Sequence, residues 1–211
     1  LQKDVVWTRD DASRSQTQAR VDALLAQPLS ADAAVQIALL NNPGLQAAFN
    51  TLGIAEADWV AAQRLPNPGL TLARKTRGSE VEWERMLHFS LAALLTMPMR
   101  ADIEQRLFEQ TRHELVLQVL RLAADTRKAW VAAVAAGQSA HYQQQAMEAA
   151  EAGAELARRM AQVGNWSRLK QAREQTFYAD AALAVARAEQ AKRQTHERLV
   201  RLMGLHGADR L

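Results

Sequence analysis

The sequence contains no cysteine, and this absence excludes several kinds of chemistry. Disulfide frameworks, thiolate metal sites and thiol nucleophiles all require the missing sulfur atom. The lack of cysteine does not indicate the cellular compartment, because chains without cysteine suit both the cytoplasm and an oxidising cell envelope. Glycine and aromatic residues are also scarce, with nine glycines and 5% aromatics in 211 residues. Sandwiches and α/β sheets normally use more of both, so the composition favours long helices in close contact.

Long apolar runs and blocks of like charge are missing as well. No stretch approaches the roughly 20 apolar residues that a membrane-spanning helix needs, so any insertion into a bilayer is expected to use β-strands. The formal net charge is only +3, and basic residues alternate with acidic ones along the whole chain. Such interleaving is typical of a solvated surface and gives no indication of a nucleic-acid site.

Side chains that carry catalysis elsewhere are dispersed in this sequence. Carboxylate pairs such as Glu148 with Glu151 are typical of solvated helix faces. A glycine-rich phosphate loop is missing, and no histidine stands at ligand spacing from a second histidine or a carboxylate. We therefore expect no catalytic site, no bound metal and no cofactor. The five histidines are His88, His113, His141, His196 and His206.

The first part of the chain predicts a lead followed by two helices. Residues 1–28 are polar with scattered apolar side chains, and an extended N-terminal lead with a short helical turn is expected there. Ser30 is a suitable N-cap, and apolar residues follow at helical spacing until an Asn-Asn-Pro triplet interrupts at 41–43. The proline of this triplet can open a second helix, and the pattern continues to Arg64.

Residues 65–99 are predicted to form a β-hairpin. Two prolines end the preceding helix, because neither has an amide proton to donate. Apolar and polar residues then alternate from about Leu70 to Leu95, with a short turn at 78–80. One face is apolar and the other largely polar, over a length that could cross a bilayer. A soluble hairpin on a helical core explains the same alternation, but an isolated ribbon is marginal and this chain offers no further strands.

Two long helices are predicted beyond the hairpin. A helical pattern runs from about Arg100 to Gln162, which is roughly 90 Å of helix. Gly164 supplies a turn, and a second helix returns to Leu202 with small residues on two seams about 100° apart. Two seams predict a helix held between neighbours on both sides, whereas a wide buried face in an ordinary bundle is the alternative. The first seam comprises Leu169, Ala172, Thr176, Ala179, Leu183 and Ala186, and the second Phe177, Ala181, Ala184, Ala188, Ala191 and Thr195.

Three stretches resemble the TolC-like outer-membrane factors of tripartite efflux and secretion systems. Residues 29–45 resemble the opening helix of that family, which ends in Asn-Asn-Pro. The Arg-Leu-Pro-Asn-Pro-Gly-Leu sequence at 64–70 resembles the junction into the first barrel strand. The turn at 163–169 and the closing Arg-Leu-Met-Gly-Leu at 201–205 resemble the periplasmic tip and the end of one repeat. In order and spacing, these stretches cover about residues 29–205.

The resemblance implies a mainly α fold, in which long antiparallel coiled-coil-like helices carry a two-stranded β-hairpin of an oligomeric outer-membrane β-barrel. It divides the chain into the lead, a periplasmic helical domain (29–64 and 100–205), the barrel hairpin (65–99) and a tail or linker to a second repeat (206–211). Family members carry this unit twice, and a trimer closes a twelve-stranded barrel continuous with a twelve-helix tunnel. Either the chain is the N-terminal half of a longer protein, or six copies close the same barrel.

The function implied by the resemblance is passive conduction across the bacterial outer membrane, with an extension into the periplasm. A periplasmic adaptor would bind the tip, an inner-membrane pump would supply the energy, and no cofactor or enzymatic step is needed. The alternative is a soluble coiled-coil scaffold or adaptor, which would purify without detergent. Neither reading predicts the transported substrate, because a wide water-filled tunnel selects weakly.

The resemblance places candidate site residues at the tip. On the ribbon, candidate residues follow from the cost of a charge in hydrocarbon, about 2–4 kcal/mol at mid-membrane. The tip matches the docking turn of the family residue by residue only at Val163 and Gly164, and a plain helical turn explains the glycine equally well. The adaptor-docking tip is expected to comprise Val163, Gly164, Asn165, Trp166, Ser167 and Arg168. On the ribbon, the lipid-facing set comprises Leu87, Phe89, Leu91 and Leu95, and the lumen-facing set comprises Glu82, Glu84, His88 and Ser90.

Overall fold

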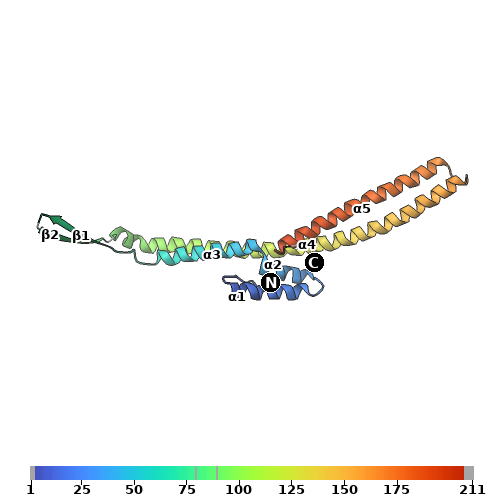
Figure 1. Cartoon of the computed structure of the whole chain (residues 1–211). Coiled ribbons are helices and arrows are strands. Elements are labelled where there is room, and N and C mark those ends of the chain that lie inside the picture. Colours follow the sequence, from blue (N-terminus) through green and yellow to red (C-terminus); the bar gives the residue numbers. More distant parts are fainter. Residues whose placement is uncertain (1–2, 79, 89, 207–211) are drawn as a thin grey trace. The chain divides into compact units, whose positions relative to one another are not determined.

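The computed structural model describes residues 3–78, 80–88 and 90–206. These residues group into two compact units, which are shown with their helices and strands in Figure 1. One unit combines the chain up to Gln46 with the chain from Val119 onward, and the other runs Ala47–Gln118. The predicted tail at 207–211 lies outside the described residues.

The lead is helical over most of its length, so the prediction of an extended segment over residues 1–28 was wrong there. Helix α1 spans Asp11–Leu25 and begins with a capping box, in which Asp10 accepts a hydrogen bond from the Ser13 amide at 2.7 Å. The Ser13 hydrogen bonds also hold the pKa of Asp10 below its ordinary value. Only Thr17 and Val21 of α1 are buried, so its apolar stripe is too sparse to show a helical period in the sequence.

The segment before α1 is extended, and two glutamine side chains hold it. The Gln36 side-chain amide donates to the carbonyl of Asp4 at 2.9 Å, and that of Gln46 donates to the carbonyl of Val6 at 2.8 Å. Each glutamine also accepts a backbone amide of the same segment, from Asp4 and Thr8. Both amides therefore bind the lead as a neighbouring β-strand would.

Helices α2 (Ala31–Asn41) and α3 (Pro43–Ala62) begin where the sequence predicts. The Ser30 side chain accepts the amide of Ala33 at 3.1 Å and caps α2, while Pro43 occupies the first position of α3, where its missing amide costs nothing. Six of the eleven α2 residues are buried, which makes α2 the centre of the core.

The core lies where α1, α2, the middle of α4 and the end of α5 meet. Helix α4 spans Leu91–Gln162 and contributes residues to both compact units, and α5 spans Arg168–Leu202. The Trp130 indole of α4 donates to the carbonyl of Leu29 at 2.9 Å, which fixes α4 to the start of α2. The buried core residues are Val21, Ala34, Ile37, Ala38, Leu40, Ala129, Leu199, Val200, Met203 and Leu205.

The end of α2 and the end of α5 are held together by the Asn-Asn pair. The Asn41 amide donates to the carbonyl of Gly204 at 2.7 Å, and the Asn42 amide donates to that of Leu202 at 2.9 Å. The side-chain oxygen Oδ1 of Asn42 also accepts the Leu45 backbone amide at 3.0 Å and caps α3. The two asparagines therefore satisfy carbonyls that the end of α5 would otherwise leave unpaired.

One buried polar atom of α4 has no partner, and this leads to a stability prediction. Thr126 is fully buried, and its hydroxyl makes no hydrogen bond within the described part of the chain. Such a group costs about 1–3 kcal/mol. The isosteric Thr126→Val variant is therefore expected to raise the free energy of unfolding by roughly 1 kcal/mol in urea titrations. Thr126→Ser, which keeps the hydroxyl and loses a methyl group, should lower it; a less stable valine variant would show that the hydroxyl is satisfied.

In the first unit, α5 returns antiparallel beside the second half of α4 (Figure 1). Small side chains make this pairing close, because Ala140, Ala150 and Ala157 of α4 are at most 3% exposed. The prediction of a long helix, a glycine turn and a returning helix is confirmed.

In the second unit, the hairpin lies between the end of α3 and the beginning of α4. The rings of Trp59 on α3 and Phe108 on α4 stack with centroids 5.4 Å apart, which shows that the two helices lie side by side. Strands β1 (Gly69–Arg77) and β2 (Glu80–His88) pair antiparallel in a two-stranded sheet. Gly78 begins the turn with a φ of 62°, which glycine adopts without strain.

The second strand is shorter than the alternation predicts. It ends at His88, and α4 begins at Leu91 instead of near Arg100. The Ser90 hydroxyl accepts the amide of Ala93 at 3.3 Å and so starts a helix of leucine and alanine, which are strong helix formers. In a stretch that is apolar almost throughout, a period of two cannot be told from a helical period. Pro98 lies inside α4, although it lacks the amide that an interior helical position uses.

Candidate functional site

The strand register divides the hairpin into two chemically different faces. Leu70 lies opposite Leu87 and Arg74 lies opposite Trp83, so both pairs share one face. The intervening pairs, such as Lys75 opposite Glu82, share the other. The apolar face is defined here as Leu70, Leu72, Arg74, Thr76, Val81, Trp83, Arg85 and Leu87. The polar face is defined as Thr71, Ala73, Lys75, Glu82, Glu84, Met86 and His88.

The apolar face is uncovered. Leu70, Leu72 and Leu87 are 63–70% exposed and Trp83 is 61% exposed. Burying an apolar side chain releases about 25 cal/mol per Å² of surface, so four such side chains in one plane indicate a surface that contacts something apolar. Arg74 lies over the Trp83 ring with 5.7 Å between the guanidinium carbon and the ring centroid.

The polar face is held by interactions between its own side chains. The Lys75 ammonium and the Glu84 carboxylate are 2.6 Å apart, and the Thr71 hydroxyl lies 3.1 Å from a ring nitrogen of His88. Thr71, Lys75 and His88 are exposed and Glu84 is half-buried, so water reaches this side of the ribbon. The leucines and Trp83 of the first face suit apolar surroundings and the second face suits water, while Arg74 and Arg85 add two charges to the first face toward the turn.

The predicted lipid-facing and lumen-facing residues are only partly brought together. Leu87 lies on the apolar face, and Glu82, Glu84 and His88 lie on the polar face. Ser90 is a helix cap instead of a strand residue, and Leu91 and Leu95 lie one turn apart in α4. Phe89 falls outside the described residues. The environments assigned to all these residues stay predictions.

The tip between α4 and α5 is a tight glycine turn. Gly164 has a φ of 79°, and the amides of Asn165 and Trp166 both donate to the carbonyl of Met160 at the end of α4. The Ser167 hydroxyl then accepts the amide of Lys170 at 3.3 Å and caps α5. Five of the six predicted tip residues lie in this turn, and the sixth, Arg168, is the first residue of α5.

The tip exposes apolar surface beside positive charge. Val163 and Leu169 are 70% and 63% exposed, and the Lys170 ammonium lies 5.7 Å from the centroid of the half-buried Trp166 ring. The sequence-based tip did not include Leu169 or Lys170. The spacing of four residues between Trp166 and Lys170, which places both on one side of a helical turn, was the signal that could have indicated the contact.

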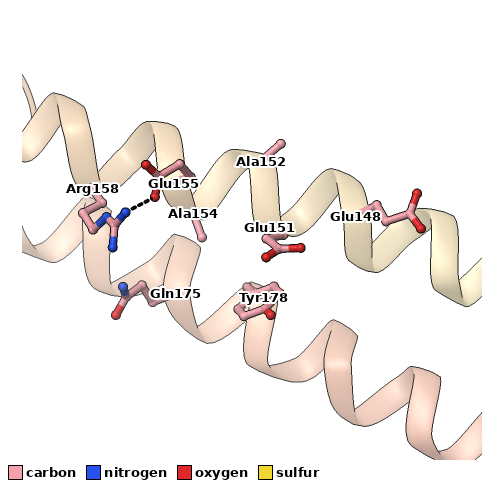
Figure 2. Close-up of a pocket in the computed structure, with 8 residues that line it drawn as sticks. All are labelled: Glu148, Glu151, Ala152, Ala154, Glu155, Arg158, Gln175 and Tyr178. Carbon is pink, nitrogen blue, oxygen red and sulfur yellow. Dashed lines mark ion pairs between the residues drawn. The ribbon is translucent and has the colours of Figure 1, made fainter.

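A cleft of about 720 Å³ separates α4 from α5 below the tip. Figure 2 shows Glu151 of α4 and Tyr178 of α5 facing each other across it, and Glu155 paired with Arg158. A hydrogen bond from Arg159, which is 2.7 Å long, is the main reason why the pKa of Glu155 lies below its ordinary value. Polar side chains thus line this cleft beside Ala152 and Ala154, between the buried Ala150 and Ala157.

The two predicted seams of α5 differ in exposure. All six residues of the first seam are exposed, with Leu169 and Leu183 at 63% and 49%. Four of the second seam, Ala181, Ala184, Ala188 and Thr195, are half-buried, while Phe177 and Ala191 are exposed. A coiled-coil-like seam at steps of three and four is therefore left without a partner among the described residues.

The described residues form neither a membrane-spanning helix nor a metal site. No described helix combines the length and the apolarity needed to cross a bilayer. Over residues 3–78, 80–88 and 90–206, no three histidine or acidic side chains gather in a way that could hold a metal ion.

Comparison with solved structures identifies the fold. CusC, a protein that changes conformation on folding and transmembrane channel formation, superposes with a TM-score of 0.66 at 14% identity. The match covers 90% of this chain and 44% of CusC. The CmeC outer membrane channel of Campylobacter jejuni has a TM-score of 0.68 at 15% identity and covers 100% of this chain and 46% of CmeC. The outer-membrane channel OprN has a TM-score of 0.65 at 16% identity and covers 96% of this chain and 50% of OprN.

The chain has the fold of one TolC-like repeat. No protein-family model matches its sequence, and no curated protein sequence matches it. The chain spans about half the length of the channels that it superposes on. The predicted fold class, long antiparallel helices with a two-stranded hairpin, is confirmed.

Proposed function

We propose that this TolC-like repeat forms part of an outer-membrane efflux or secretion channel, a passive conduit that extends into the periplasm. The observation that supports this most strongly is the exposed hairpin with one apolar and one polar face, carried by helices of TolC-like arrangement. CmeC and OprN, which share the arrangement, are outer-membrane channels. The proposal requires no catalytic residue and no cofactor.

In the proposed channel, copies of the hairpin pair edge to edge and close a barrel. A two-stranded ribbon is marginally stable alone, and both outer edges of this ribbon lack a strand partner within the described sheet. The apolar face, including Leu87, would contact lipid. The polar face, with Glu82, Glu84 and His88, would line the aqueous lumen, where charges stay hydrated.

The helices would form the wall of the periplasmic tunnel. The exposed first seam of α5 would pack against a helix of a neighbouring repeat, in a homotrimer of chains with two repeats or a hexamer of chains with one. The tip with Val163, Gly164, Asn165, Trp166, Ser167 and Arg168 would dock a periplasmic adaptor, and an inner-membrane pump would drive transport. Exposed Val163 supports this role, because apolar surface at a turn offers contact area to a partner.

Arginine substitutions at two adjacent β2 residues test the proposal. Leu87→Arg places a charge on the apolar face, at a cost of up to about 2–4 kcal/mol per copy in the hydrocarbon region. Met86→Arg, its matched control, places the same charge on the polar face opposite Thr71. Only the first should reduce the amount of oligomer in the outer-membrane fraction, measured on density gradients and by gel migration without heating.

Two outcomes would contradict this account. Loss of assembly in the Met86 variant alone would show that the polar face meets lipid. A parent protein and variants that all remain in the soluble fraction without detergent would instead support the coiled-coil scaffold.

A further inference from the structure

A second cleft lies in the 47–118 unit, where α3 ends, the chain enters β1 and α4 begins. Its volume is about 330 Å³, within the range of small-ligand pockets of about 300–1,000 Å³. Leu65, Pro66 and Met97 give it apolar walls, and Arg64 and Arg100 bring two guanidinium groups to it from different segments. Among the residues that the structure describes, none that lines this cleft carries a carboxylate.

Both arginines lack an ionic partner. Neither guanidinium forms an ion pair or a hydrogen bond with any side chain that the structure describes. Arg158 and Arg159, by contrast, are both paired with Glu155. Two unpaired cations beside one cleft repel each other, and an anion bound between them would relieve the repulsion.

The same two arginines flank two uncharged stretches of the chain. Arg64 is the last charged residue before the uncharged stretch 65–73, and Arg100 is the first after the stretch 86–99, whose only titratable side chain is His88. The second stretch exposes Leu91, Leu95 and Met99, at 63%, 74% and 64%, on one side of α4. Arg64 and Arg100 therefore stand where the uncharged stretches 65–73 and 86–99 end on the helical side. Arginines at the end of uncharged, largely apolar stretches are typical of a membrane boundary, where cations meet lipid headgroups.

From this arrangement we infer that Arg64 and Arg100 bind the phosphate of an anionic phospholipid headgroup at the periplasmic leaflet of the membrane. The inference rests on the proposed insertion of the hairpin. Guanidinium groups bind phosphate oxygens through paired hydrogen bonds, and Leu65, Pro66 and Met97 contact the start of the acyl chains. The bound lipid fixes the depth at which the barrel ends and the helices begin.

Lipid selectivity measured in vesicles tests the inference. The full chain is reconstituted in phosphatidylcholine vesicles with spin-labelled phosphatidylglycerol or spin-labelled phosphatidylcholine, and the immobilised fraction gives the relative association constant. The parent chain should prefer phosphatidylglycerol. The Arg64→Gln, Arg100→Gln double variant should lower its association about fivefold per arginine, roughly 25-fold in all.

The matched control is Arg106→Gln with Arg112→Gln. It removes the same charge from exposed positions of α4 that lie further from the uncharged band and should keep the preference. Immobilised lipid without a preference, or an equal loss in both double variants, would overturn the headgroup site and leave the channel proposal standing. If millimolar inorganic phosphate removes the preference at matched ionic strength, the site binds a free anion and the lipid assignment is wrong. If no lipid of either kind is immobilised, the hairpin does not insert, and the channel proposal fails together with the site.

Discussion

Replacing Gly204 by alanine is expected to lower the free energy of unfolding by roughly 2–6 kcal/mol, the sum of backbone strain of about 1–3 kcal/mol and overpacking of about 1–3 kcal/mol. Gly204 has a φ of 67°, which residues with a Cβ rarely adopt. The added Cβ would also lie 2.4 Å from the carbonyl oxygen of Asn41. Because both atoms belong to the main chain or are attached directly to it, no side-chain rotation relieves the overlap.

Urea unfolding followed by far-ultraviolet circular dichroism would measure this change, with Gly137→Ala as the control. Gly137 lies inside α4, and a Cβ there meets nothing within 4 Å. Alanine should therefore raise stability by up to about 1 kcal/mol at that position. If the Gly204 variant is as stable as the parent, the contact between the Asn-Asn pair and the end of α5 is looser than described.

The second large effect is expected at Ile37, where alanine should cost about 2–5 kcal/mol. Ile37 is fully buried in the centre of α2, which packs against α1 and lies at the middle of the core. Its removal leaves a cavity in the only region where four helices meet among the described residues, and close-packed neighbours can fill it only in part.

Ile54→Ala serves as the control for this substitution. Ile54 is 64% exposed on α3, so its truncation should change the stability of the isolated chain by no more than about 0.5 kcal/mol. Chemical denaturation of both variants in parallel measures the difference. Equal losses would mean that Ile54 is also buried, and equal small changes would show that α2 is not the centre of the core.

Asn41 and Asn42 connect the end of α2 to the end of α5, and Gly204 lies so close to Asn41 that a Cβ there would overlap its backbone. In the sequence, Asn-Asn-Pro at 41–43 and Met-Gly-Leu at 203–205 are two separate motifs. Their direct contact could not be predicted, because the two are about 160 residues apart along the chain.

Helix starts were predicted well because their signals are local. Ser30 caps α2, Ser167 caps α5 and Pro43 opens α3, as expected. The prediction failed at Leu91–Met99, where a nearly uniform apolar composition hides the period and Pro98 argues against a helix that nevertheless forms. Helix α1 was missed because a mostly exposed helix has little apolar stripe to detect.

The candidate sites were predictable only to the extent that they are local. The polar and apolar sets of β2 follow from alternation up to His88, and the tip follows from Gly164. Which medium each hairpin face meets depends on lipid and on neighbouring copies, so it is not determined by the order of residues in one chain. The Arg64 and Arg100 pair was missed, because 36 positions separate the two residues in sequence and only the fold brings them to one cleft.

Cryo-electron microscopy of the protein extracted from outer membranes tests the central claim most directly. The account predicts a ring-shaped oligomer in which the β-hairpins form a closed barrel inside the detergent belt, with Leu70, Leu72 and Leu87 facing outward and the α4 and α5 pairs forming a tunnel wall below it. Elongated particles without a detergent belt, whose hairpins pair only two by two in water, would contradict it.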